Sequence, residues 1–82
     1  MTNEEKKYQE KLAALRHLAG SEGWEAICVE LDAAIEMEME NLAHAEDPVS
    51  VMRSAGAIQA LRKVMSIPDT YIRASEFEDP HN

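Results

Sequence analysis

The sequence predicts an all-α protein, and three observations support this prediction. Apolar residues recur every three or four positions along most of the chain, as on one face of a helix. Residues that favour helix starts precede these periodic segments, and glycine or proline follows them. The two-residue alternation of a strand is confined to residues 36–41, which lie inside a longer helical pattern. We therefore expect one helical domain over residues 1–76, with an antiparallel hairpin at its centre.

The first predicted helix covers residues 3–19. Thr2 and Glu5 have the spacing of a capping box, in which each side chain satisfies a backbone N–H of the other. Gly20 supplies the C-cap, and Ser21 can cap the next helix at once. The two helices should meet at a tight corner, with the first packed on the hairpin.

The hairpin is predicted from residues 22–43 and 48–65. Asp47 is a good N-cap and Pro48 suits the first helical position, so a new helix should begin there. A connection of only about four residues makes neighbouring helices antiparallel. The apolar face of each helix should form the seam between them. The expected core residues are Trp24, Leu31, Ile35, Leu42, Val51, Ile58, Leu61 and Met65.

Pro68 is expected to end this hairpin, because proline breaks the hydrogen bonding of a helix interior. A short C-terminal helix should follow over residues 69–76. Residues 77–82 have no periodicity and are predicted to form a flexible tail.

Composition excludes several classes of protein. A chain of 82 residues buries only roughly 60–65% of its unfolded surface, so a partner or self-association would help its stability. The single Cys28 excludes an internal disulfide and is expected to be a small core residue. The charged N-terminus and the lack of an apolar run of about 20 residues predict a protein that is neither secreted nor membrane-spanning.

The formal net charge of −8 disfavours direct binding to nucleic acid or to anionic lipid, because both require a basic surface. The charge is also segregated. Residues 21–47 hold nine acids and no Lys or Arg, and residues 48–66 hold three bases and no acid. This pattern predicts two neighbouring elements that attract each other.

The stretch EMEMEN, residues 36–41, alternates like a strand and concentrates three carboxylates. In a helix, however, Glu38 points roughly 160–200° away from Glu36 and Glu40, so the three cannot converge on a cation. The chain also lacks the Glu-x-x-His pairs on facing helices that a di-iron bundle needs, and it has no phosphate-binding loop and no nucleophile beside a base. We expect no metal site, no cofactor and no catalytic residue.

Two charges intrude on the predicted seam, Glu38 on one helix and Arg62 on the other. One hypothesis is that both side chains reach outward over the edge of the seam. The other is that they project into a contact with the first helix or with a second chain, where Arg16 is a candidate partner. A direct pair would require the register to slip.

A second apolar row runs along the far side of the helix at residues 22–43. Either the first helix covers it or its residues are tolerated at the surface; alternatively, it is a partner interface. Glu36 and Glu40 flank it and would suit a basic partner. The row consists of Ala26, Val29, Ala33 and Met37.

About three quarters of the chain resembles small helical-hairpin proteins of tailed bacteriophages, encoded near packaging and virion genes. The resemblance lies in the corner at residues 21–24, the long acidic helix, the restart at Asp47-Pro48, the segment GAIQALR at residues 56–62 and the break at residues 67–68. It implies a virion or assembly accessory protein and transfers no catalytic residue.

The function that we expect is therefore non-enzymatic: self-association, or docking on a larger phage protein, in the host cytoplasm or the virion. An alternative is an inhibitory binder whose acids imitate a phosphate backbone and occupy a basic groove on a host protein. A nucleic-acid adaptor using the three bases of residues 48–66 is the weakest hypothesis. The acids of the alternative are Glu25, Asp32, Glu36 and Glu40, and the three bases are Arg53, Arg62 and Lys63.

Overall fold

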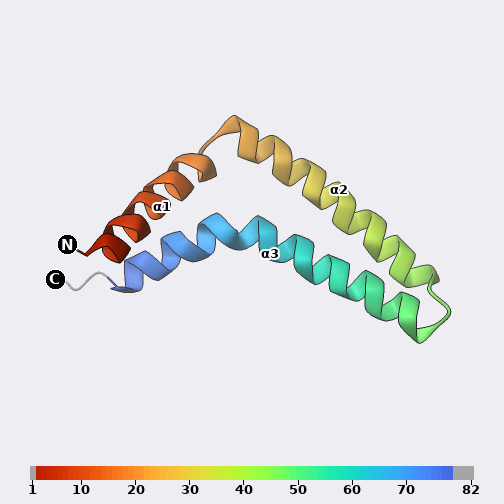
Figure 1. Ribbon diagram of the computed structural model, residues 1–82. Helices are drawn as coiled ribbons and strands as arrows, with labels where there is room; N and C mark the ends of the chain where they lie inside the picture. The colour runs from red at the N-terminus through yellow and green to blue at the C-terminus, as the bar shows by residue number, and fades with distance from the viewer. Residues whose placement is uncertain (1, 79–82) are drawn as a thin grey trace. The chain divides into compact units, whose positions relative to one another are not determined.

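Three helices make up the part of the chain that the computed structural model describes, residues 2–78 (Figure 1). Helix α1 spans Asn3–Ala19, α2 spans Glu22–His44 and α3 spans Pro48–Glu78. These residues contain no strand, so the predicted all-α class is confirmed. None of the helices in residues 2–78 has both the length and the apolar character that a membrane crossing requires.

The start of α1 and the corner before α2 are both fixed by hydroxyl caps. Thr2 has an extended backbone, and its Oγ1 accepts the N–H of Glu5 at 3.1 Å. Ser21 Oγ accepts the N–H of Trp24 at 3.1 Å and donates to the carbonyl of Leu18 at 2.7 Å. One side chain therefore satisfies an unpaired donor of α2 and an unpaired acceptor of α1, which keeps the corner short.

The start of α3 depends on Asp47. Its Oδ1 accepts the Ser50 N–H and its Oδ2 accepts the Ser50 hydroxyl, both at 2.9 Å. These two bonds favour the charged carboxylate, the backbone bond most, and hold the pKa of Asp47 below its ordinary value of 3.8. A charged N-cap therefore begins α3 directly after the loop.

Helix α3 continues through Pro68, so the predicted break and the separate C-terminal helix are wrong. Residues 69–76 are helical, but they extend α3 as far as Glu78. Proline lacks the N–H that would bond to the carbonyl four residues earlier, yet its fixed φ is compatible with a helix. Pro68 is buried, and this burial offsets part of the lost bond. Of the predicted tail, residues 77 and 78 are helical, and 79–82 lie outside the described residues.

The described residues fall into two compact units, separated after residue 25 and before residue 67. In the first unit, α1 packs beside residues 67–78 of α3. Arg16 donates to Ser75 Oγ at 3.1 Å, and the Lys11 ammonium lies 5.4 Å from the centre of the Tyr71 ring. Leu12, only 3% exposed, is the buried centre of this pairing.

The second unit, residues 26–66, is the hairpin of α2 and the first part of α3. The two helices run antiparallel and side by side (Figure 1). Ile35 and Ile58, each 7% exposed, are buried in the seam. The main buried and half-buried positions of each helix follow one another at intervals of three or four residues, which places them on one side of the helix. On α2 they include Cys28, Leu31, Ile35, Glu38 and Leu42, and on α3 they include Ser50, Ser54, Ile58, Leu61 and Met65.

Two expected core residues do not belong to this seam. Val51 is 40% exposed. The residue that faces the seam is Ser54, and Val51, three positions earlier, lies about 60° away from it around the helix axis. Trp24 is half-buried but belongs to the first unit. Met39 is 50% exposed for the same reason as Val51, because its position around the helix axis is turned away from the seam.

Both units have thin cores. Leu12, Ile35 and Ile58 are the buried hydrophobic side chains other than Pro68 in residues 2–78, and none of these residues is fully buried. Two helices can bury only the line along which they touch, because no third layer covers that line. The folded chain therefore gains little apolar burial for its length.

Replacing Ser21 by alanine should lower the free energy of unfolding by about 1 kcal/mol, because the change removes an N-cap. Urea unfolding followed by helical circular dichroism measures this loss. The matched control is Ser66→Ala, which removes a mid-helix hydroxyl bonded to the Lys63 carbonyl and should change stability by less than about 0.5 kcal/mol. Equal effects of the two substitutions would contradict the capping role.

Acidification should weaken the Asp47 cap. Because the folded pKa lies below the ordinary 3.8, the charged cap stabilises the protein above that pH and loses its effect as pH falls through the folded value. Asp47→Asn keeps a capping oxygen and removes the charge. The urea midpoint of the wild type should exceed that of Asp47→Asn near neutral pH and approach it in acid. A gap that stays constant with pH would contradict this explanation.

Candidate interaction surface

The predicted row on the outer side of α2 is exposed along its whole length. Val29 and Met37 are each 65% exposed, and Ala26 and Ala33 are exposed as well. The hairpin itself therefore does not cover this row. Single exposed apolar residues are normal, but four aligned on one helical face form a continuous strip.

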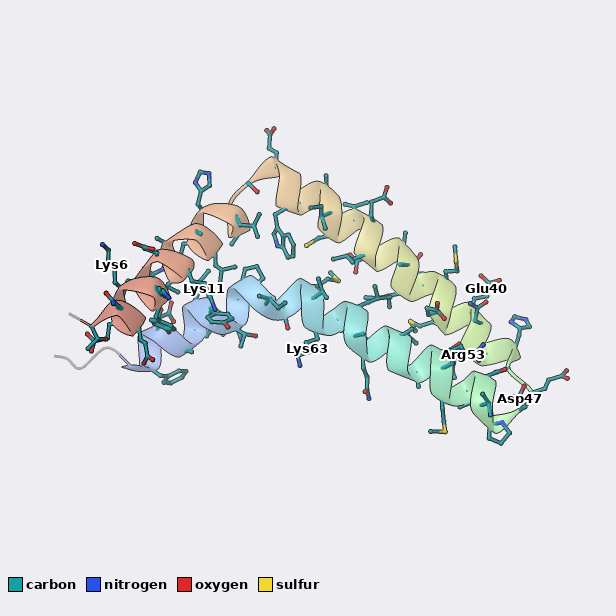
Figure 2. All side chains as sticks on the ribbon, viewed as in Figure 1. Lys6, Lys11, Glu40, Asp47, Arg53 and Lys63 are labelled. Carbon is teal, nitrogen blue, oxygen red and sulfur yellow. The ribbon has the colours of Figure 1, made fainter. Side chains whose placement is uncertain are left out.

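The acids around this row are exposed and lack basic partners. Glu36 and Glu40 are both exposed, and Figure 2 shows Glu40 on the side of α2 that faces away from α3. In residues 2–78 the only ion pair joins Arg73 to Asp69 at 3.5 Å. The charge segregation between residues 21–47 and 48–66 therefore produces no ion pair within the hairpin, contrary to the attraction that the sequence suggested.

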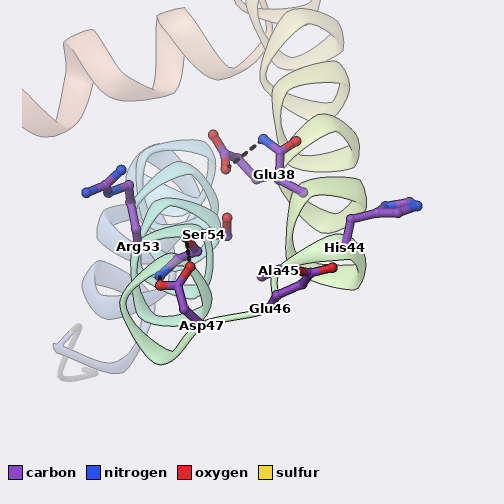
Figure 3. A pocket seen from close by; sticks show the side chains of 9 residues that line it. Glu38, His44, Ala45, Glu46, Asp47, Arg53 and Ser54 are labelled. Carbon is purple, nitrogen blue, oxygen red and sulfur yellow. Dashed lines mark hydrogen bonds between the residues drawn. The ribbon is translucent and has the colours of Figure 1, made fainter.

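Glu38 lies at a position of the seam that a hydrophobic residue would normally fill. It is half-buried, and its Oε1 accepts a long hydrogen bond of 3.5 Å from Asn41 Nδ2. Glu38 and Ser54 line the same open groove of about 580 Å³, which extends to the loop. Ser54 is only 7% exposed, and Figure 3 shows it between α3 and Glu38. The seam therefore becomes polar towards the loop.

Arg62 lies elsewhere on the hairpin. It is exposed and lines a smaller groove of about 340 Å³ with Asp32, Ile35 and Met65. The structure does not pair Glu38 with Arg62, in agreement with the register expected from the short loop. Arg16, the other candidate partner, donates to Ser75.

The acidic, histidine and cysteine side chains carry groups that can bind metals or react. No group of three or more His, Cys, Asp or Glu side chains in residues 2–78 is arranged to hold a metal ion. Cys28 is a half-buried thiol on the seam side of α2. His44 Nδ1 lies 2.9 Å from the Glu40 carbonyl at the end of α2, a position that suits a histidine.

The sequence interpretation missed a set of exposed apolar residues on α3. Val49 is 64% exposed, Met52 73% and Val64 43%. The sequence prediction for this helix covered only the face that includes Ile58, and these residues lie on a different side. Their helical spacing was visible in the sequence and could have identified them.

Comparisons of the chain with family models, with curated proteins and with solved structures found no match. The phage resemblance therefore stays a prediction, and the exposed surfaces described above are the structural features that bear on function.

Replacing Glu38 by leucine should stabilise the hairpin by about 1 kcal/mol, because a half-buried carboxylate at a seam position gives way to an apolar side chain. Urea unfolding measures the gain. Glu36→Leu is the control on the exposed side and should stay within about 0.5 kcal/mol. Size-exclusion chromatography of Glu38→Leu separates the two hypotheses for Glu38: an unchanged oligomeric state favours a side chain that only reaches outward, and a lost oligomer favours an interfacial one.

Proposed function

We propose that this protein is a non-enzymatic phage accessory protein that acts in assembly by associating through its helices. The partner is a second copy or a larger virion protein, and the contact is made by the outer row of α2. The observation that carries the proposal is the 65% exposure of both Val29 and Met37 in a chain whose helices bury so few apolar side chains. The phage setting, in the host cytoplasm or virion, rests on the sequence resemblance alone.

The physical support comes from the thin core. Full burial of a Val or Met side chain contributes roughly 1.5–3 kcal/mol, which is a large amount for a two-helix unit. Ala26 and Ala33 are small, so the backbone of a partner helix can approach α2 closely. A partner helix on this row would supply the third layer that the hairpin lacks.

A second candidate function is the acidic inhibitory binder that imitates nucleic-acid phosphates. It is favoured by the exposure of Glu25, Asp32, Glu36 and Glu40, none of which forms an ion pair in residues 2–78. Salt distinguishes the two functions. Binding driven by exposed charge weakens as salt rises, whereas burial of an apolar row persists.

Light scattering as a function of concentration tests the proposed row. The mass should rise above the 9.2 kDa of one chain, and Met37→Lys should raise the dissociation constant at least about ten-fold by placing a charge in the contact. Met39→Lys is a matched control, since Met39 is 50% exposed on the same helix but lies off the row. Equal effects of the two substitutions, or association that disappears in high salt, would argue against the proposal.

A further inference from the structure

The outer side of α3 carries an apolar row that resembles the row on α2. Gly56 and Ala60 are exposed between the more prominent apolar residues at the two ends, and a Cβ placed on Gly56 would meet nothing within 4 Å. The hairpin itself therefore gives no packing reason for a glycine in mid-helix, where glycine is unfavourable. The row consists of Val49, Met52, Gly56, Ala60 and Val64.

The two rows share one spacing and carry opposite charges. The first four residues of each row follow one another at intervals of three, four and four positions. Beside the α2 row stand Glu30 and Glu40, and at the equivalent positions beside the α3 row stand Arg53 and Lys63. All four charged residues are exposed. The rows thus have similar shapes and complementary electrostatics.

The rows face away from each other within the hairpin. Successive helical residues turn by about 100°, which places each row roughly opposite the seam side of its own helix. In Figure 2 Glu40 points away from α3 and Lys63 points away from α2. Figure 3 shows His44 and Arg53 pointing outward on the two sides of the hairpin. A single hairpin therefore cannot bring its own two rows together.

We propose that the α2 row of one copy packs on the α3 row of a second copy. The inference rests on the proposed function and names its partner surface. Charge complementarity selects this occupant: two α2 rows would bring acids together and two α3 rows would bring bases together, whereas the mixed contact pairs acid with base. In this contact the acids beside the α2 row, which form no ion pair inside the hairpin, lie against the bases beside the α3 row of the other copy.

The register of the hairpin predicts which residues of the two rows meet in this contact. A second copy displaced sideways keeps α2 and α3 antiparallel and at the same height as in the hairpin, where Glu38 lies near Ser54. Met37 then lies over Gly56, and Ala33 lies near Ala60. Glu40 comes close to Arg53, and Glu30 comes close to Lys63. A large side chain over a glycine is the combination that lets two helices approach closely.

Because the contact joins two different faces, each bound copy still presents one unused row of each kind. Such a heterologous contact repeats from copy to copy, and it produces a ring if the rotation closes and a filament if it does not. A contact of one row with the same row of another copy would instead stop at two chains. The number of copies therefore distinguishes the two arrangements.

The test uses two variants, each with one row blocked. Met37→Lys blocks the α2 row, and Gly56→Lys combined with Ala60→Lys blocks the α3 row. Lysine is a good helix former at these exposed positions, and circular dichroism confirms that each variant is folded. Gln59→Lys adds the same charge beside the α3 row without covering it, and serves as the control. The masses of the wild type, of each variant and of an equimolar mixture are measured by light scattering.

The wild type should exceed two copies, and each blocked variant alone should be monomeric at the same concentration. Their mixture should form a complex of two copies and no more, because only one intact α2 row and one intact α3 row remain. Gln59→Lys should assemble like the wild type.

Three results would overturn the inference: a monomeric wild type, a mixture without a complex, or undiminished assembly of the variant blocked on α3. If that variant assembles while Met37→Lys does not, the proposed α2 row stands and only the partner surface is wrong. If Met37→Lys assembles like the wild type, the proposed function itself fails.

Discussion

The structure depends on the seam between antiparallel helices, because each unit consists of only two helices. In the hairpin this seam is a single line of side chains centred on Ile35 and Ile58, and in the first unit it is centred on Leu12. A line of contact gives no enclosed core, so each residue that faces the seam contributes a large share of the stability of its unit. Glu38 and Ser54 interrupt the line with polar groups, and near this end of the hairpin Asp47 caps the start of α3. The hydrogen-bonded corners at Ser21 and Asp47 thus supply part of the order that a larger core would otherwise provide.

The thin seam also explains why so much apolar surface stays outside. A helix in a two-helix unit has one neighbour and therefore one covered side. Apolar residues on any other side, such as Val29 on α2 or Met52 on α3, remain exposed unless another chain covers them. The acids and bases beside these residues behave in the same way. They are segregated between the two helices, yet in residues 2–78 the only ion pair is the local pair Asp69–Arg73, which lies outside the hairpin.

Local signals were sufficient to predict most of the fold. Thr2, Ser21 and Asp47 cap the helices as their positions in the sequence indicated, and the short loop predicted the antiparallel hairpin. The break at Pro68 was mispredicted because burial of the proline ring is a tertiary effect that no local rule contains. Val51 was misplaced because it stands about 60° from the true seam, an angle that depends on which neighbour the helix meets. The α2 row was predicted from its spacing. The α3 row has the same kind of spacing but was not predicted, and its exposure in the structure distinguishes it from the buried face around Ile58.

The continuity of α3 has a consequence for the order of folding. The hairpin closes a short loop, so its contacts are local in sequence and cost little chain entropy. The first unit instead joins distant segments, since Arg16 and Ser75 are 59 positions apart. Because α3 runs through both units, a formed hairpin already provides the helix on which residues 67–78 can extend, and we expect α1 to dock after the hairpin has formed. For the same reason we expect α1 to be the first helix to detach, which would leave the hairpin and both of its outer rows intact.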